Sequence, residues 1–213
     1  MLKMNSKNLI IPGIVTLLPM LIGVYFWNRL PDVMSTHFGL DNEANGFSSK
    51  KMAVFGIPLF LLTMMGVVYH VTSRDPKNKN ISPKVKTILI WIVPVISVWT
   101  AAVIYPVNLG YELNVIFAAA LLLGLLCIII GNYLPKSRQN HSVGIRIRWT
   151  LENEANWNKT HRFAGYLWMA GGILTLLLSL TRVVPAQWIF GIFPILVAVP
   201  CFYSYWLHAK KGL

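Results

Sequence analysis

The sequence is poor in acidic residues and in cysteine, and both shortages limit what the chain can be. Only 7 of its 213 residues are aspartate or glutamate, and charged residues of both signs make up 12% of the chain. Soluble domains carry about 25% charged residues, so a membrane protein is expected. The two cysteines, Cys127 and Cys201, lie inside separate apolar runs, which excludes a disulfide framework and a C-x-x-C metal site.

Six long apolar runs occupy most of the chain. They cover residues 9–27, 53–72, 88–107, 113–134, 163–181 and 187–207. Each is close to the ~20 helical residues that cross ~30 Å of hydrocarbon, and lipid forces a spanning segment to satisfy its own backbone hydrogen bonds. The first run is too long for a typical signal-peptide core and no A-x-A-like cleavage site follows it. The sequence therefore predicts an all-α polytopic membrane protein with six transmembrane helices.

The cationic residues are distributed unevenly between the two sides of this predicted bundle. With both termini on one side, that side holds 15 of the 19 lysines and arginines, in the amino-terminal tail (Lys3, Lys7), the 73–87 and 135–162 loops and the carboxy-terminal tail. The other four are Arg29, Lys50, Lys51 and Arg182. Cytoplasmic loops carry such an excess, so both termini are predicted to be cytoplasmic. The net charge of +12 then favours contact with anionic membrane lipids, and no direct nucleic-acid partner is predicted.

The outer loop, residues 28–51, contains four acidic or histidine side chains within twelve positions. Asp41 begins a pattern like a calcium loop, but the twelfth position, where that loop needs glutamate, is Met52. A single His37 is too few nitrogen ligands for a typical zinc site. Asn45-Gly46 is a strong turn signal. We interpret the loop as a turn-rich surface, with recognition of an external ligand as the alternative, and we predict no metal and no cofactor.

The two inner loops differ in character. The 73–87 loop is polar with two prolines, and we expect it to be irregular and solvated. In the 135–162 loop, Thr150 is a plausible N-cap for a helix that starts at Leu151, lies at the membrane surface and leads into the fifth span. Trp157 and His161 share a face of that helix. This pattern fits either an interfacial anchor or a docking surface for a partner.

Neither catalysis nor ion transport has a clear sequence signature. Glu154 and His161 are about 10 Å apart along a straight helix, too far for a direct acid–base pair. No H-E-x-x-H, G-x-S-x-G or phosphate-binding glycine motif is present, so no enzyme is predicted. The spans hold almost no ionisable residues, which disfavours a proton-coupled pump. A protein that recognises an external ligand is therefore one hypothesis, and a small-molecule or peptide transporter or exporter is the alternative.

Two stretches carry a resemblance to a known family. The outer one is Leu30-Pro31-Asp32, then Thr36-His37-Phe38-Gly39, ending at Lys50. The inner one begins with Gly131-Asn132-Tyr133-Leu134-Pro135-Lys136, followed by Asn140 and Gly144-Ile145-Arg146. It continues with Trp149-Thr150-Leu151, Asn153-Glu154 and Trp157, and ends with Thr160-His161-Arg162-Phe163-Ala164-Gly165. In order and spacing these stretches resemble the hallmark motifs of the SdpI family. One departure is that Ile147 and Arg148 stand where the family usually has Thr-Pro.

The resemblance implies a function and partners. SdpI-type proteins are multi-pass proteins of the bacterial cell membrane, and the founding member gives immunity to a secreted toxic peptide. It also acts in signal transduction, by holding a small repressor at the membrane. By resemblance, the expected partners are an SdpC-like toxin outside the cell, membrane lipids, and an ArsR-like repressor in the cytosol. Residues 1–72 would contribute two spans and the outer loop, and residues 73–213 the SdpI-like four-span region.

The same resemblance indicates candidate site residues. In the outer loop, the candidates to face a toxin are Asp32, His37, Gly39 and Lys50. In the inner loop, the candidates to bind a partner are Asn140, Gly144, Arg146, Trp149, Thr150, Trp157, Thr160, His161 and Arg162.

Overall fold

The computed structural model describes residues 6–181 and 189–213, and within them the protein is mostly helical. Five helical segments are long and apolar enough to cross a membrane: Met52–Ser73, Pro83–Asn108, Val115–Lys136, Glu154–Thr181 and Ile192–Lys211. The first predicted run forms a shorter apolar helix, α1 (Ile10–Tyr25), after a 3₁₀ turn at Ser6–Leu9. Lys3, Arg182 and the expected short loop at 182–186 lie outside the described residues.

The chain divides into two compact units. The first comprises Met1–Val71 and Lys86–Ala118, and the second comprises Thr72–Val85 and Ala119–Leu213. The segment that joins α2 (Ile57–Ser73) to α3 (Pro83–Asn108) thus belongs with the carboxy-terminal helices, although most of α2 and α3 belongs to the first unit.

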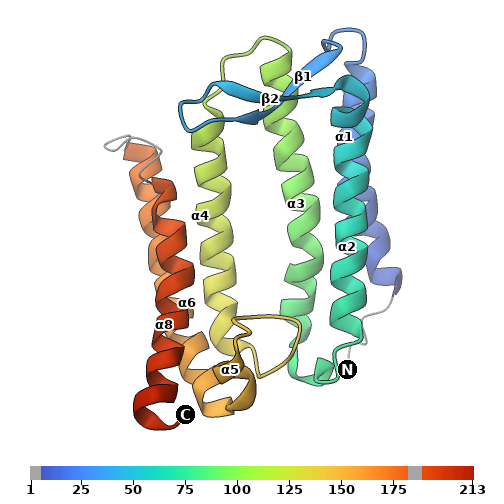
Figure 1. Ribbon diagram of the computed structural model, residues 1–213. Coiled ribbons are helices and arrows are strands. Elements are labelled where there is room, and N and C mark those ends of the chain that lie inside the picture. Colours follow the sequence, from blue (N-terminus) through green and yellow to red (C-terminus); the bar gives the residue numbers. More distant parts are fainter. Residues whose placement is uncertain (1–5, 182–188) are drawn as a thin grey trace. The chain divides into compact units, whose positions relative to one another are not determined.

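The first unit contains α1, α2, most of α3 and a two-stranded antiparallel hairpin, β1 (Val33–Phe38) with β2 (Ala44–Ser49), at one end of the helices (Figure 1). Its buried core includes Met34 from the hairpin, Val54 from the π-helical turn before α2, and Tyr105 from α3. The Asn108 side chain accepts a hydrogen bond from the Ser35 amide at 2.8 Å and donates one to the Ser35 carbonyl at 3.0 Å. These contacts fix the hairpin on the end of α3.

The hairpin corrects two expectations. The sequence indicated only loop structure here, and the turn was expected at Asn45-Gly46. The reversal instead occupies Gly39–Glu43, where the Gly39 amide donates to the Glu43 carbonyl at 2.8 Å and Asn42 adopts a left-handed φ of 68°. Gly46 lies within β2 opposite His37, and an added Cβ would approach the His37 Cβ to 2.7 Å. Glycine is required there by a strand irregularity, and asparagine tolerates the left-handed conformation at position 42.

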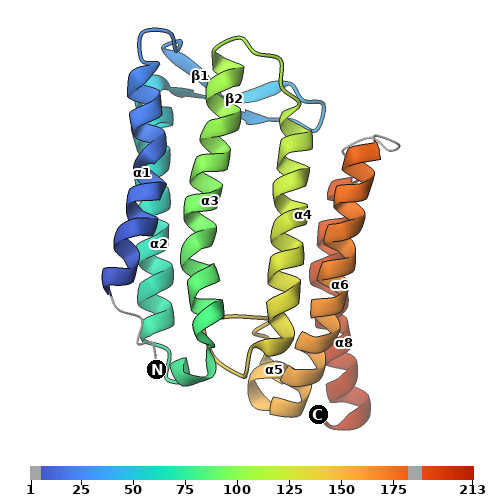
Figure 2. The ribbon, with the colours of Figure 1, turned by 180° about the vertical axis from the view of Figure 1, so that it is seen from behind.

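The second unit consists of most of α4 (Val115–Tyr133), α6 (Glu154–Thr181), α8 (Ile192–Lys211) and the short α5 (Arg148–Glu152) at one end. Helices α4 and α6 run side by side (Figure 2), and glycine pairs set their separation. A Cβ on Gly131 would lie 2.8 Å from the Gly165 carbonyl, and one on Gly172 would lie 2.6 Å from the Gly124 carbonyl. Small residues of this kind allow close backbone approach in membranes.

The prediction of one helix that starts at Leu151 with Thr150 as its N-cap is wrong, because the segment forms two helices, α5 and α6. Asn153 has an extended backbone that separates α5 from α6, and its Oδ1 accepts the Asn156 amide at 3.0 Å. Asn153 is therefore the N-cap of α6, a role that asparagine fills well. Thr150 lies inside α5, where its Oγ1 accepts the Ile147 amide at 3.1 Å.

Candidate functional site

The two loops at one end of the second unit bond to each other, which corrects the expectation that residues 73–87 are solvated. Asp75 is only 7% exposed. Its carboxylate accepts the Lys77 amide at 2.7 Å, the His141 amide at 2.8 Å and the Ser142 hydroxyl at 2.5 Å. A buried carboxylate is stable when hydrogen bonds replace its lost water, and here three donors do so. Asp75 therefore fastens the first inner loop to the second.

Gln139 makes a second connection between these loops. Its Oε1 accepts Lys77 Nζ at 2.5 Å, and its backbone carbonyl accepts Asn80 Nδ2 at 2.7 Å. Its Nε2 donates to the carbonyls of Thr150 at 2.9 Å and Leu151 at 3.0 Å in α5. One glutamine thus holds both loops and α5 together. We call the assembly of residues 72–85 and 134–162 the loop platform.

Asn140 shapes the chain that leads to Gly144. It is fully buried, and its Oδ1 accepts the amides of Ser142 at 2.9 Å and Val143 at 2.7 Å. Its Nδ2 donates to the Arg138 carbonyl at 2.8 Å. Such local bonds to the main chain are the reason that asparagine favours turns. These bonds stabilise one backbone conformation for the residues that follow Asn140.

Trp157 and His161 form the centre of the platform. Their rings stack at 3.9 Å with an interplanar angle of 17°. Trp157 Nε1 donates to the Ser137 carbonyl at 2.7 Å. His161 Nε2 lies 3.0 Å from the Ile145 amide, and Nδ1 lies 2.8 Å from the Trp157 carbonyl. An amide can only donate and a carbonyl can only accept, so both bonds require a neutral imidazole with its proton on Nδ1.

Gly144 allows the close approach of this loop to the aromatic pair. Its φ is +115°, and a Cβ there would collide with His161 Nε2 and lie 3.2 Å from the Trp157 ring. No other residue type meets both requirements without strain. The Gly-Ile-Arg motif is thereby explained: glycine fits against the rings, and the Ile145 amide bonds to the histidine.

Helix α8 is fixed to the platform through Asn156. Its Nδ2 donates to the Ser204 carbonyl at 3.0 Å and to the Leu213 carbonyl at 3.1 Å. Its Oδ1 accepts the hydroxyls of Thr160 at 3.0 Å and Ser204 at 2.6 Å. Trp149 of α5 packs on the Tyr205 ring, with centroids 5.0 Å apart. The carboxy-terminal end of the chain therefore lies at the same end of the second unit as both inner loops.

Burial and hydrogen bonding have opposing effects on Asp75. Burial raises its pKa, and the bonds from the Ser142 hydroxyl and from the Lys77 and His141 amides lower it. The bonds prevail, so the pKa of Asp75 lies below its usual range. The carboxylate is thus ionised at neutral pH, and it accepts hydrogen bonds without acting as an acid.

The structure places the predicted inner residues in three groups, which differ in exposure. Five are at most 1% exposed and lie inside the platform: Asn140, Thr150, Trp157, Thr160 and His161. Gly144 and Trp149 are partly covered, whereas Arg146 and Arg162 are exposed. Arg146 also donates to the His141 carbonyl at 2.6 Å. The geometry is that of a rigid buried scaffold with cationic side chains on its surface, which suits recognition of an acidic partner or of phosphate groups.

Sequence reasoning missed Asp75, Gln139, Asn156 and Ser204. Asp75-Pro76 is a turn signal, and Asn156 and Thr160 have helical i, i+4 spacing, so Asp75 and Asn156 had local signals. The partners of Asp75 are 66 and 67 residues away in sequence, a relation that no local pattern shows.

The predicted outer residues do not form one cluster. Lys50 Nζ pairs with Asp32 at 3.0 Å, donates to the Trp27 carbonyl at 3.2 Å and lies 5.2 Å from the centre of the Trp27 ring. This pair closes the base of the hairpin. His37 and Gly39 lie near its turn, about 17 Å and about 23 Å along the chain from Asp32. His37 Nδ1 bonds to Asn45 Oδ1 at 2.6 Å on the exposed surface.

Comparison with known proteins agrees with the motifs. Residues 136–204 match the SdpI/YfhL protein family, and residues 14–62 match a domain of unknown function, DUF1648. The chain is 28% identical to the "Immunity protein SdpI" of Bacillus subtilis (strain 168) over 174 residues, which cover 81% of this chain and 82% of that protein. No solved structure matches the chain. The loop platform residues from Lys136 onward lie inside the region that matches the SdpI/YfhL family, and this similarity together with the five long apolar helices indicates a multi-pass membrane protein.

Proposed function

We propose that the protein is an immunity protein of the bacterial cell membrane that protects against a secreted peptide toxin. The observation that carries this proposal is the similarity to an immunity protein over 81% of the chain, together with the platform built by the family motif residues. The loop platform would be the cytoplasmic working surface, through Arg146, Trp149 and Arg162. The hairpin residues Asp32, His37, Gly39 and Lys50 would face the toxin.

The proposal includes six spans with both termini in the cytoplasm. The 3₁₀ turn Ser6–Leu9 and helix α1 together rise about 32 Å, which is enough to cross the hydrocarbon. In the second unit, both inner loops and the carboxy-terminal end lie together and carry many cations, including Arg74, Arg138 and Lys211. The positive-inside rule places that end in the cytoplasm.

The hydrogen bonds of the polar side chains in the spans favour a receptor over an exporter. The hydroxyls of Thr16, Thr175 and Ser179 are buried, and each donates to a carbonyl of its own helix at 2.7–2.8 Å. The O–H donors of these hydroxyls are therefore not available to a polar substrate. The two readings are separated by the fate of a labelled toxin, which stays with cells that carry a receptor and returns to the medium with an exporter.

The test of immunity is survival of a toxin-sensitive bacterium that expresses the protein and is challenged with an SdpC-type peptide. The control is an unrelated six-span protein at the same membrane level. Protection by this chain alone is the expected result. Equal killing of both strains would contradict the proposal.

A second, signalling function is favoured by the exposed cations of the platform. We propose that Arg146 and Arg162 hold an ArsR-like repressor at the membrane when toxin is present. Fluorescently tagged repressor should move to the membrane on addition of toxin. The double variant Arg146→Ala/Arg162→Ala should leave it in the cytosol, whereas Lys84→Ala, which removes a different exposed cation of the platform, should not. Repressor that stays cytosolic with the wild-type protein would reject this role without affecting the immunity proposal.

A further inference from the structure

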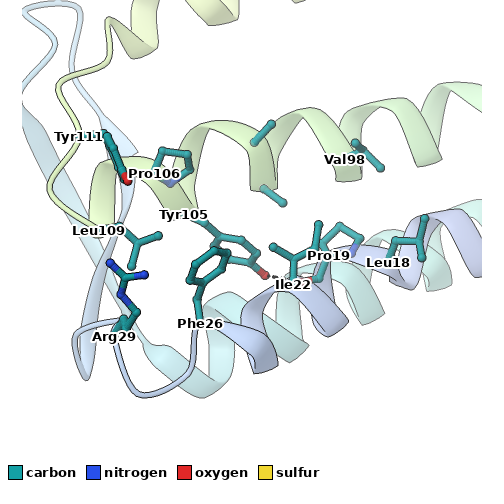
Figure 3. Close-up of a pocket in the computed structure, with 12 residues that line it drawn as sticks. Leu18, Pro19, Ile22, Phe26, Arg29, Val98, Tyr105, Pro106, Leu109 and Tyr111 are labelled. Atoms are coloured by element: carbon teal, nitrogen blue, oxygen red, sulfur yellow. Dashed lines mark hydrogen bonds between the residues drawn. The ribbon is translucent and has the colours of Figure 1, made fainter.

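The first unit contains a cavity that the proposed function does not use. It has a volume of about 320 Å³ and lies between α1 and α3 (Figure 3). This volume is within the range of roughly 300–1,000 Å³ that ligand sites occupy. Its walls are apolar, with Leu18, Ile22 and Phe26 on the α1 side and Val98 and Leu109 on the α3 side.

The cavity has one cationic end and one apolar end. Arg29 and Tyr111 lie at one end, and Leu18 and Val98 lie at the other (Figure 3). The Arg29 side chain is exposed, and within the described residues it pairs with no carboxylate. The Tyr105 hydroxyl in the wall donates to the Pro19 carbonyl at 2.9 Å. Arg29 is thus the one charged group of the lining, and it is available to an anion.

The position of the cavity indicates what fills it. Val98 and Pro106 both line it and are eight residues apart on α3, a membrane-span candidate, so the cavity extends about 12 Å along the helix. Leu18, Ile22 and Val98 remain 40–46% exposed, so the cavity is open at the side. Water is disfavoured in an apolar cavity, and a bilayer supplies acyl chains at that depth. The arginine lies at the hairpin end, where the headgroups of that leaflet would be.

We propose that this cavity, the Arg29 pocket, binds one acyl chain of an anionic phospholipid, whose phosphate pairs with the Arg29 guanidinium. Arginine suits phosphate because its planar guanidinium donates two parallel hydrogen bonds. The proposal does not depend on immunity, since it concerns the membrane lipid that the first unit holds.

The test uses full-length protein in nanodiscs with phosphatidylglycerol that carries a photoreactive diazirine on one acyl chain. Cross-linked peptides are mapped by mass spectrometry. Ala102→Trp fills the pocket from its exposed wall, and Ala170→Trp adds the same side chain to an exposed position on α6 as its control. Arg29→Gln removes the cation, and Lys51→Gln removes an exposed cation outside the pocket.

Cross-links should concentrate on the pocket residues of α1 and α3 and fall at least fivefold in Ala102→Trp but not in Ala170→Trp. Arg29→Gln should retain them with phosphatidylcholine and lose an about fivefold preference for phosphatidylglycerol, since one cation at a membrane surface contributes about that factor. Lys51→Gln should keep the preference. Cross-links spread evenly over all lipid-facing helices, or unchanged in Ala102→Trp, would overturn the proposal. So would a pocket that excludes lipid because an apolar peptide segment occupies it.

Discussion

At the scale of single residues, the contacts of the motif histidine, His161, stabilise the loop platform. His161 is 1% exposed, and both ring nitrogens are used inside the platform, by the Ile145 amide and the Trp157 carbonyl. A partner protein cannot touch it in this conformation. The adjacent Arg162 is exposed. Two neighbouring motif residues therefore serve different purposes, one inside the scaffold and one on its surface.

This difference gives the first prediction. His161→Ala should lower the free energy of unfolding by about 2–4 kcal/mol, because it leaves a cavity beside Trp157 and removes the acceptor of the Ile145 amide. Arg162→Ala should change it by less than about 0.5 kcal/mol, as exposed substitutions do. Thermal unfolding of both variants in detergent measures this. A His161→Ala protein as stable as the wild type would show that the platform does not need the histidine.

Asp75 gives a prediction about pH. Its pKa is lowered in the folded state, so its stabilising effect is complete above its ordinary pKa of 3.8 and is lost as pH falls through the lower folded value. The melting temperature should therefore decline below about pH 4 in the wild type. In Asp75→Asn this part of the decline should be absent, and stability at neutral pH should drop by about 1–3 kcal/mol, because the amide presents donors to donors.

The control for Asp75 is Asp41→Asn in the exposed turn of the hairpin. Its carboxylate accepts one amide, that of Glu43, at 3.0 Å. Asp41→Asn should keep the wild-type decline in acid. Identical acid profiles for the wild type and Asp75→Asn would mean that Asp75 does not link the two loops.

At the scale of elements, substitution of two glycines with positive φ distinguishes the cost of backbone strain from the cost of a steric clash. Gly144 has φ +115° and touches His161, whereas Gly110 has φ +91° and open space around it. Gly110→Ala should cost about 1–2 kcal/mol from backbone strain alone. Gly144→Ala should cost at least about 2 kcal/mol more, because the methyl group displaces the histidine. Equal losses in unfolding experiments would indicate that the contact between Gly144 and His161 is loose.

The packing of α4 on α6 predicts that glycine-to-alanine substitutions at two helical positions change stability in opposite directions. Gly172→Ala places a methyl group 2.6 Å from the Gly124 carbonyl, and only a separation of the helices relieves that contact. It should destabilise the protein by about 1–3 kcal/mol. Gly66→Ala in α2 meets nothing within 4 Å and should be neutral or stabilising by up to about 1 kcal/mol. A stabilising Gly172→Ala would contradict this packing.

Sequence patterns predicted some elements and not others, for physical reasons. Apolar runs predict the membrane-spanning helices because the thickness of the bilayer sets the length of such a run. The family motif gives the residues of the platform, but it does not show that most of them are buried. The break at Asn153 and the displaced hairpin turn depend on single side-chain bonds that compete with propensity. The bonds of Asp75 to His141 and Ser142 join residues far apart in sequence, which periodicity cannot detect.

At the scale of the whole molecule, topology can be tested by labelling. In a variant with Cys127→Ala and Cys201→Ala, a single cysteine is introduced at Glu43 in the hairpin or at Arg138 in the platform, both exposed. A membrane-impermeant maleimide should label Glu43→Cys in intact cells. It should label Arg138→Cys only after the membrane is opened. Labelling of Arg138→Cys in intact cells would reverse the proposed orientation.

We propose that this membrane protein protects its host from a peptide toxin, with the loop platform as its inner working surface. The most direct measurement is the toxin dose that kills half of the cells expressing the wild type, His37→Ala or Arg146→Ala/Arg162→Ala, at equal membrane levels. We expect a wild-type dose at least about tenfold above that of cells with an unrelated membrane protein. The variants should require a lower dose than the wild type although they remain folded. A wild-type dose equal to that of the control cells would contradict it.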